Sequence, residues 1–224
     1  KQPELKHAAV KVLKAELPWT MLAIGWLPQD QALLAREELR HAMDVFPFAS
    51  CVPFGHERTG VLLRAAAYEA PPEEIVARIE ALFGLDASDT LRYADRRKGQ
   101  RRTVRLVQHG AEARLQAFVL AGDTSAQSWM KTLLQEELPA QAYGRALLAP
   151  GAKPPAMVAS RGRAICTCFN VTDAQIQSCL AQAEGNDDQR LARLQARLQC
   201  GTNCGSCVPE LKRMVQASQP QMSI

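Results

Sequence analysis

The pattern of apolar and polar positions predicts alternating strands and helices over the first 150 residues. The nine residues from Trp19 to Leu27 are apolar enough for a buried strand, and they are far fewer than the roughly 20 that cross a bilayer. A helix is expected next, with Asp30 as its N-cap. Its apolar positions recur at helical spacing and are Leu39, Met43 and Phe46. Residues 60–69 (GVLLRAAAYE) are a second strand candidate.

The same alternation continues to about residue 135. Two prolines and two glutamates at 71–74 favour a helix start, and Gly84 is suited to ending that helix. Residues 90–121 predict three strands, the last two joined by a hairpin loop at 109–113. Gly122, Asp123 and Thr124 then predict a turn and a cap before a helix that carries Trp129, Leu133 and Leu134. Residues 18–150 are therefore predicted to form an α+β domain, with a mixed, largely antiparallel sheet and flanking helices.

A small all-α domain is predicted at residues 164–224. It follows residues 151–163, whose Pro, Gly, Ala and Ser content without an apolar period is typical of a linker. Thr172 and Gln175 match a capping box. The helices expected here have Ile176, Cys179 and Leu180 inward in the first, Leu191, Leu194 and Leu198 in the second, and Pro209 near the start of the third. Residues 1–17 are too few to bury a core and are expected to be the tail of a preceding domain.

Composition narrows the classes of partner. The formal net charge of +4 comes without an aromatic-interleaved basic surface, so we expect no nucleic acid partner. The start shows no signal peptide and resembles a cut point, and we expect a cytoplasmic protein with no membrane contact. Six of the seven cysteines lie between residues 166 and 207. This clustering indicates metal or redox chemistry rather than disulfides.

The cysteines supply the candidate chemistry. Cys166 and Cys168 form one close pair, and Cys204 and Cys207 form another. Brought together, the pairs give the four thiolates of a [2Fe-2S] cluster, but four thiolates also suit a structural zinc ion. Gly201 and Gly205 stand where the backbone would approach the metal site and direct its N–H groups at the sulfurs.

Three further cysteines need an interpretation. Cys200 precedes Cys204 by four residues and could replace a ligand or lie buried beside the site; we favour the buried position. Cys51 and Cys179 are interpreted as small core residues. The four histidines share no ligand spacing and lie away from the cysteine pairs, so we assign none to catalysis.

A basic run is the remaining feature. Seven positive charges lie between residues 92 and 105, and they suit either a solvated strand rim or a docking face for an acidic electron donor. These residues are Arg92, Arg96, Arg97, Lys98, Arg101, Arg102 and Arg105.

The segments CTCFNVTDAQI and CGTNCGSCVPEL resemble the bacterioferritin-associated-ferredoxin type of [2Fe-2S] domain over residues 164–216. That resemblance implies Cys166, Cys168, Cys204 and Cys207 as the cluster ligands and makes zinc a minor alternative. The form with the additional Cys200 is similar to the C-terminus of bacterial assimilatory nitrate reductase catalytic subunits. The opening KQPELKHAAVKV resembles the end of the molybdopterin-dinucleotide domain of molybdenum reductases, and RYADRRKGQRRTVRL resembles the region that follows that domain.

The resemblance implies an oxidoreductase that reduces nitrate to nitrite, of which this chain carries electron transfer and no substrate site. A molybdenum-bis(molybdopterin guanine dinucleotide) cofactor and a [4Fe-4S] cluster are then expected in the rest of the catalytic subunit. The expected electron donor is a reduced flavoprotein or ferredoxin-type protein. The alternatives are a fragment of a siroheme nitrite reductase, a free-standing ferredoxin and a zinc-stabilised interaction module. The chain has no Gly-x-Gly-x-x-Gly motif, so flavin or nicotinamide binding by this chain is not expected.

Overall fold

A computed structural model describes residues 17–55, 58–151, 162–169 and 171–218. The chain divides into two compact units, one built chiefly from residues up to 151 and the other from residues after 162. The predicted tail at 1–17 and linker at 151–163 lie almost wholly outside the described residues, so both boundaries stay predictions.

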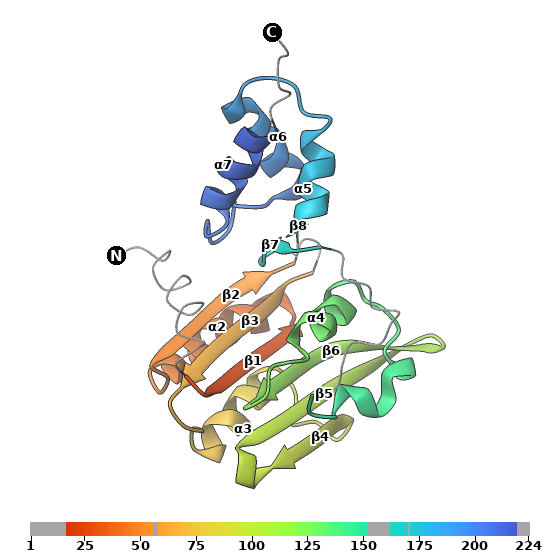
Figure 1. Cartoon of the computed structure of the whole chain (residues 1–224). Coiled ribbons are helices and arrows are strands. Elements are labelled where there is room, and N and C mark those ends of the chain that lie inside the picture. The colour runs from red at the N-terminus through yellow and green to blue at the C-terminus, as the bar shows by residue number, and fades with distance from the viewer. Residues whose placement is uncertain (1–16, 56–57, 152–161, 170, 219–224) are drawn as a thin grey trace. The chain divides into compact units, whose positions relative to one another are not determined.

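The first unit is built on a six-stranded sheet (Figure 1). The strand order is β2-β3-β1-β6-β5-β4, and β1 pairs antiparallel with both β3 and β6, as β5 does with β4 and β6. The strands are β1 (Trp19–Trp26), β2 (Phe48–Phe54), β3 (Gly60–Ala67), β4 (Thr90–Asp95), β5 (Gln100–His109) and β6 (Glu112–Ala121). The α+β class and the largely antiparallel sheet are confirmed.

Helices cover both faces of this sheet (Figure 1). One face packs against α2 (Gln29–Met43) and α3 (Glu73–Leu82), and the other packs against α4 (Gln127–Gln135). Trp26 fixes α4 by donating from Nε1 to the Leu134 carbonyl at 3.1 Å. The described part of this unit also contains two short 3-10 helices, η1 (Arg96–Lys98) and η2 (Gln141–Leu147).

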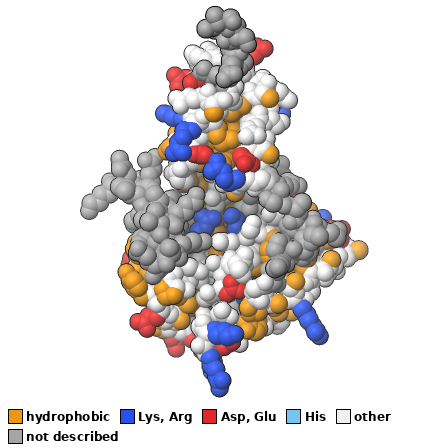
Figure 2. Space-filling model, viewed as in Figure 1, with side chains coloured by type: hydrophobic (Ala, Val, Ile, Leu, Met, Phe, Trp, Pro, Cys, Tyr) orange, Lys and Arg blue, Asp and Glu red, His pale blue; other side chains and the backbone are white. Residues whose placement is uncertain are grey.

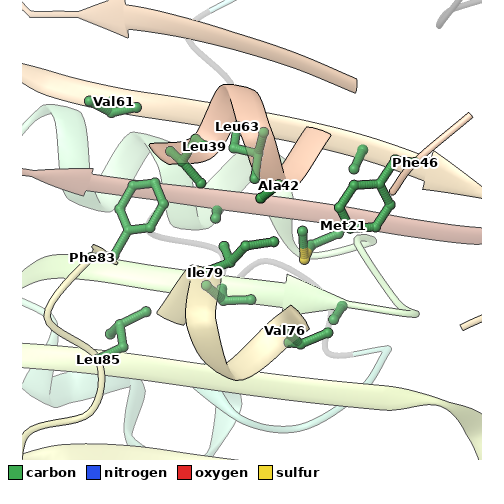
Figure 3. Packing of buried hydrophobic residues seen from close by; sticks show 14 of the residues in the cluster. Met21, Leu39, Ala42, Phe46, Val61, Leu63, Val76, Ile79, Phe83 and Leu85 are labelled. Atoms are coloured by element: carbon green, nitrogen blue, oxygen red, sulfur yellow. The ribbon is translucent and has the colours of Figure 1, made fainter. Parts of the chain in front are cut away.

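The main core lies between the sheet and helices α2 and α3 (Figure 3). Leu39 from α2 and Ile79 from α3 are fully buried against strand residues such as Leu63. Phe83 and Leu85, which follow α3, extend the same core. Apolar positions at helical spacing on the helices thus meet alternate positions on the strands, which is why this sequence gives a layered domain.

Three local predictions need correction. Asp30 lies in the first turn of α2 and is not its N-cap, because the helix begins after Pro28, which has no side-chain donor or acceptor for capping. The N-cap of α4 is Ala126, so the predicted cap at residues 122–124 is wrong. Asp123 instead accepts hydrogen bonds from the backbone N–H groups of Ser125 and Gly151. Strand β2 was not predicted at all.

The basic run at 92–105 is largely neutralised within its own domain. Arg102 is buried and pairs with Asp123 at 2.7 Å, and Arg101 pairs with buried Glu80 at 2.6 Å. Arg96, Lys98 and Arg105 also have carboxylate partners, namely Glu73, Asp95 and Asp89. Basic and acidic side chains are likewise interspersed on the face shown in Figure 2. These ion pairs favour the interpretation of the basic run as a solvated strand rim, except for Arg102, which is buried.

The described residues of the second unit form three helices and one short strand pair. The helices are α5 (Asp173–Leu180), α6 (Asp187–Leu198) and α7 (Val208–Ala217), and β7 (Ala164–Cys166) pairs antiparallel with β8 (Val171–Thr172). The predicted capping box is confirmed: the Thr172 side chain accepts from the Gln175 backbone N–H, and the Gln175 side chain accepts from the Thr172 backbone N–H. The helical character is confirmed, and the strand pair is an addition to it. None of the described helices, in either unit, has the length and apolarity to cross a membrane.

Arg190 joins the helices of the second unit from inside. It is only 4% exposed, and its inward position was not predicted from the sequence. Its guanidinium donates to the carbonyls of Leu180, the last residue of α5, and of Ala183 beyond it, and to those of Val215 and Ser218 at the end of α7. Carbonyls at helix C-termini carry partial negative charge, so they stabilise a buried cation.

Candidate metal centre

Cys166 and Cys168 lie in the hairpin between β7 and β8. Cys166 ends β7 and is paired in register with Val171, so the turn between the strands carries Cys168. Thr172 ends β8 and caps α5 at once, which fixes the hairpin to the first helix. A short strand pair followed by a capped helix therefore holds the first cysteine pair in place.

Cys204 and Cys207 lie in the connection from α6 to α7. Helix α6 ends at Gln199 in the left-handed conformation, with φ of 51°. Gly201 has φ of 85°, and a Cβ there would lie 2.9 Å from a methyl carbon of Val208, so both conformation and space require glycine. Cys207 is the N-cap residue of α7, and Pro209 lies in the first turn, as predicted.

The fold brings the two cysteine pairs together. Cys168 Sγ lies 3.2 Å from Cys204 Sγ. Cys166 is hydrogen-bonded to Cys168 on one side and to Cys207 on the other. The four predicted ligands thus form a continuous series of sulfur contacts, running Cys207, Cys166, Cys168 and Cys204. Their sequence separation of more than thirty residues is closed by the packing of α5, α6 and α7.

Cys166 is the thiol of this series whose pKa is lowered. Hydrogen bonds from the thiols of Cys168 and Cys207, and from the backbone N–H groups of Phe169 and Gly201, lower the pKa of Cys166 to about 2 against the opposing effect of burial. Donating to neighbouring sulfurs raises the pKa of Cys168. The hydrogen bond to Cys166 and burial raise the pKa of Cys207. One thiolate stabilised by backbone N–H groups is the kind of environment that binds a cationic metal centre.

Exposure differs among the four thiols. Cys166, Cys168 and Cys207 are between 1% and 5% exposed, whereas Cys204 is only partly buried. Thr202, Asn203 and Ser206 beside it are exposed, and the Ser206 hydroxyl lies 3.1 Å from Cys204 Sγ. The solvent edge of the site is therefore the loop around Cys204.

The four thiols can be compared with the ligands that a zinc ion and a two-iron cluster require. A tetrahedral zinc ion needs four sulfurs at about 2.3 Å from one point. Within the described residues, no three or more His, Cys, Asp or Glu side chains are grouped so as to hold a metal ion. The series of neighbouring thiols supplies the four sulfur donors that a zinc ion or a two-iron cluster requires, and a two-iron cluster takes its thiolates distributed over two metals. Thiol chemistry and nearby N–H groups fit the cluster, although the ligand assignment stays a prediction.

The remaining cysteines lie in cores, as expected. Cys200 is fully buried and Cys179 is 7% exposed, both in the core of the second unit. Burial and the neighbouring charge of Cys166 raise the pKa of Cys200 to about 12, so it is a neutral thiol at pH 7. Cys51 packs against the core of the first unit, and burial raises its pKa to about 11.

Arg190 and the Cys166 hairpin were not found by sequence reasoning. The apolar period of α6 gave no reason to turn an arginine inward. The signal that could have indicated it is the position of Arg190 in the first turn of α6, where the antiparallel α7 places its carbonyl end.

Comparison with known proteins bears on this unit. Residues 164–217 match the family described as the BFD-like [2Fe-2S] binding domain. A nitrate reductase of Klebsiella oxytoca is 43% identical over 61 residues, which are 27% of this chain and 7% of that protein. No solved structure matches. Residues 164–217 therefore form a BFD-like [2Fe-2S] domain. The residues matched to the Klebsiella nitrate reductase make up only a small part of the length of that protein.

Proposed function

We propose that this chain is the C-terminal electron-transfer part of an assimilatory nitrate reductase. The observation that carries the proposal is that the chain has a match to BFD-like [2Fe-2S] domains and 61 residues that are 43% identical to a nitrate reductase, while the four predicted ligands lie in one series of sulfur contacts. When bound, a [2Fe-2S] cluster supplies a one-electron carrier. The chain contributes Cys166, Cys168, Cys204 and Cys207 as ligands.

The surrounding backbone would tune that carrier. The N–H groups of Phe169 and Gly201 already donate to Cys166, and such hydrogen bonds stabilise negative charge on sulfur. The N-terminus of α7 begins at Cys207, and its partial positive charge acts in the same direction. Both features favour the reduced, more negative state of the site.

In this proposal, the rest of the catalytic subunit holds the molybdenum cofactor and a [4Fe-4S] cluster, and it reduces nitrate to nitrite. Electrons come from a reduced flavoprotein or ferredoxin-type protein. The α+β domain binds no cofactor in this scheme and serves as a scaffold, consistent with its paired charges and apolar core. The length of the Klebsiella relative, of which the match spans 7%, leaves room for such a catalytic body.

The cluster is tested on the protein purified without oxygen. We expect about two irons and two acid-labile sulfides per chain, and an S = 1/2 EPR signal after reduction by dithionite. The Cys204→Ala variant should lose that signal. Stoichiometric zinc, with no signal in the unmodified protein, would favour the interaction module instead.

The nitrate reductase assignment needs a separate test in the source cells. Cys204→Ala, introduced into the gene that encodes this chain, should abolish growth on nitrate as the sole nitrogen source and leave growth on nitrite unchanged. Loss of growth on both would favour the siroheme nitrite reductase. Normal growth on both would exclude either role.

A further inference from the structure

Arg190 is a buried cation at the far ends of the two helices that begin at the predicted ligands. Helix α7 begins after Cys207, and α5 begins after Thr172, directly behind the β7–β8 hairpin that carries the other ligand pair. The carbonyls to which Arg190 donates lie at the opposite ends of the same helices, Leu180 on α5 and Val215 on α7. Two helices therefore run from the cysteine pairs to one guanidinium.

The polarity of these helices favours negative charge at the cysteines. Helix N-termini carry partial positive charge, and the partial negative charge at the C-termini opposes their effect. Arg190 offsets that opposing charge, because it places a full positive charge 3.2 Å from the Val215 carbonyl and 3.1 Å from the Ser218 carbonyl. Carbonyls and the Ser218 hydroxyl are neutral acceptors, so they hold the cation without cancelling its charge.

Apolar core lies along α7 between this cation and the sulfurs. Cys207, Leu211 and Val215 are spaced by one helical turn each and are all buried, so they form one inward stripe. Leu194, one turn after Arg190 on α6, is buried as well. Val215 lies about 12 Å along the helix from Cys207, from the rise of 1.5 Å per residue. Over such a distance a charge acts more strongly through a buried core than through water.

We propose that Arg190 raises the reduction potential of the [2Fe-2S] cluster, through its own buried charge and by offsetting the carbonyl ends of α5 and α7. The inference rests on the cluster site proposed above and makes Arg190 a positioning residue. Reduction adds one electron, and so one negative charge, to the cluster, and a fixed cation stabilises that state. The electron comes from the reduced flavoprotein or ferredoxin-type donor, and Arg190 exchanges neither an electron nor a proton.

The test is a redox titration of the intact chain, followed by the S = 1/2 EPR signal. Arg190→Met removes the charge and keeps a long unbranched side chain. At the midpoint potential of the unmodified protein, the ratio of reduced to oxidised cluster should fall about fivefold. That fall corresponds to a midpoint lower by about 40 mV, at 59 mV per tenfold for one electron. Arg190→Lys keeps the charge and should hold the ratio within about twofold.

Arg193→Met is the matched control. Arg193 lies on the same helix and nearer in sequence to the loop that carries Cys204 and Cys207, but it is exposed. This variant removes the same charge from a position that water and salt screen, so the ratio should change less than about twofold. Equal shifts in Arg190→Met and Arg193→Met, or an unchanged midpoint in Arg190→Met, would overturn the proposal.

Two further variants separate charge from folding. Arg190→Gln keeps N–H donors for the helix carbonyls and removes only the charge, so it should show the same fall and serves where Arg190→Met binds too little cluster. Ser218→Ala removes one neutral acceptor and keeps the cation, so it should leave the midpoint unchanged. A midpoint lowered by Ser218→Ala and not by Arg190→Gln would assign the effect to helix packing and refute the proposal. A cluster absent even from the unmodified protein would instead refute the proposed function.

Discussion

The two units of this chain fill their cores with different chemistry. Between the sheet of the first unit and its helices α2 and α3, the core is apolar, with aromatic and aliphatic side chains such as Phe83 and Ile79. In the second unit, five of the eleven buried core residues are cysteines. A domain of about fifty residues buries little apolar surface and often depends on a metal or disulfides. The difference teaches that the first unit is held by packing and the second by packing plus its metal centre.

Among the described residues, each unit also buries one arginine, in contrasting ways. Arg102 in the first unit is 1% exposed and meets the carboxylate of Asp123, while its Nε and Nη1 atoms have no hydrogen-bond partner. Among the described residues of the second unit, Arg190 donates to backbone carbonyls and to the Ser218 hydroxyl. The burial of Arg102 depends on the ionisation of a carboxyl group, and the burial of Arg190 depends on the packing of two helix ends against each other.

Removal of the metal should have the largest effect, because it should destabilise the second unit and not the first. Chelation under reducing conditions should cost the second unit on the order of 5 kcal/mol or more and leave the first unit folded. All three tryptophans, Trp19, Trp26 and Trp129, lie in the first unit, so tryptophan fluorescence reports that unit alone while far-UV circular dichroism reports both. A simultaneous loss of both signals at unchanged denaturant would contradict this division.

The next effect tests the ion pair of the first unit. Asp123→Asn should lower the free energy of unfolding of that unit by about 3 kcal/mol, because it leaves Arg102 buried without a countercharge. The fluorescence transition in urea measures it. Asp89→Asn, which removes the exposed partner of Arg105, is the control and should cost less than about 1 kcal/mol. Equal costs would show that burial of Arg102 does not matter.

The same pair gives a pH dependence with a definite sign. Burial would raise the pKa of Asp123, but hydrogen bonds from Ser125, Gly151 and Arg102 outweigh it and lower the pKa to about 2. A lowered folded-state pKa stabilises the fold above the unfolded value near 3.8, and that stabilisation is lost as the pH falls toward 2. Asp123→Asn should therefore flatten the acid side of the stability profile of the first unit.

The smallest effect concerns the caps of the second unit. Thr172→Ala should cost that unit about 1 kcal/mol, since its side chain caps α5. Asn186→Ala removes the equivalent capping box of α6 and should cost a similar amount. Circular dichroism of the metal-bound protein measures both, and tryptophan fluorescence should not change. A cost confined to Asn186→Ala would mean that the hairpin alone fixes α5.

Local signals in the sequence predicted local structure well. The capping box at Thr172 and Gln175, the hairpin at 109–113 and the helix after Pro72 all rest on contacts within a few residues, and all are confirmed. Strand β2 was missed although it lies beside β3, the next strand in the chain, because Pro53 within it argues against a strand.

In the candidate site, too, some features could be predicted from local sequence and others depend on how the helices pack. The two cysteine pairs follow from spacing alone, and the burial expected for Cys200 is confirmed. The contacts of Cys166 with Cys207 and of Cys168 with Cys204 cross between the pairs, and they depend on how three helices pack. The inward turn of Arg190 depends on carbonyls from two other helices. Neither feature has a local sequence signal.

Strand β2 has a consequence for solubility. It forms one margin of the six-stranded sheet, and β4 forms the other. An exposed margin invites strands of other molecules and so promotes aggregation. Pro53 removes one backbone donor from β2, and β4 carries Arg92 and Asp95. Pro53, which argued against predicting β2 as a strand, thus also makes this edge of the sheet a poor template for intermolecular strand addition.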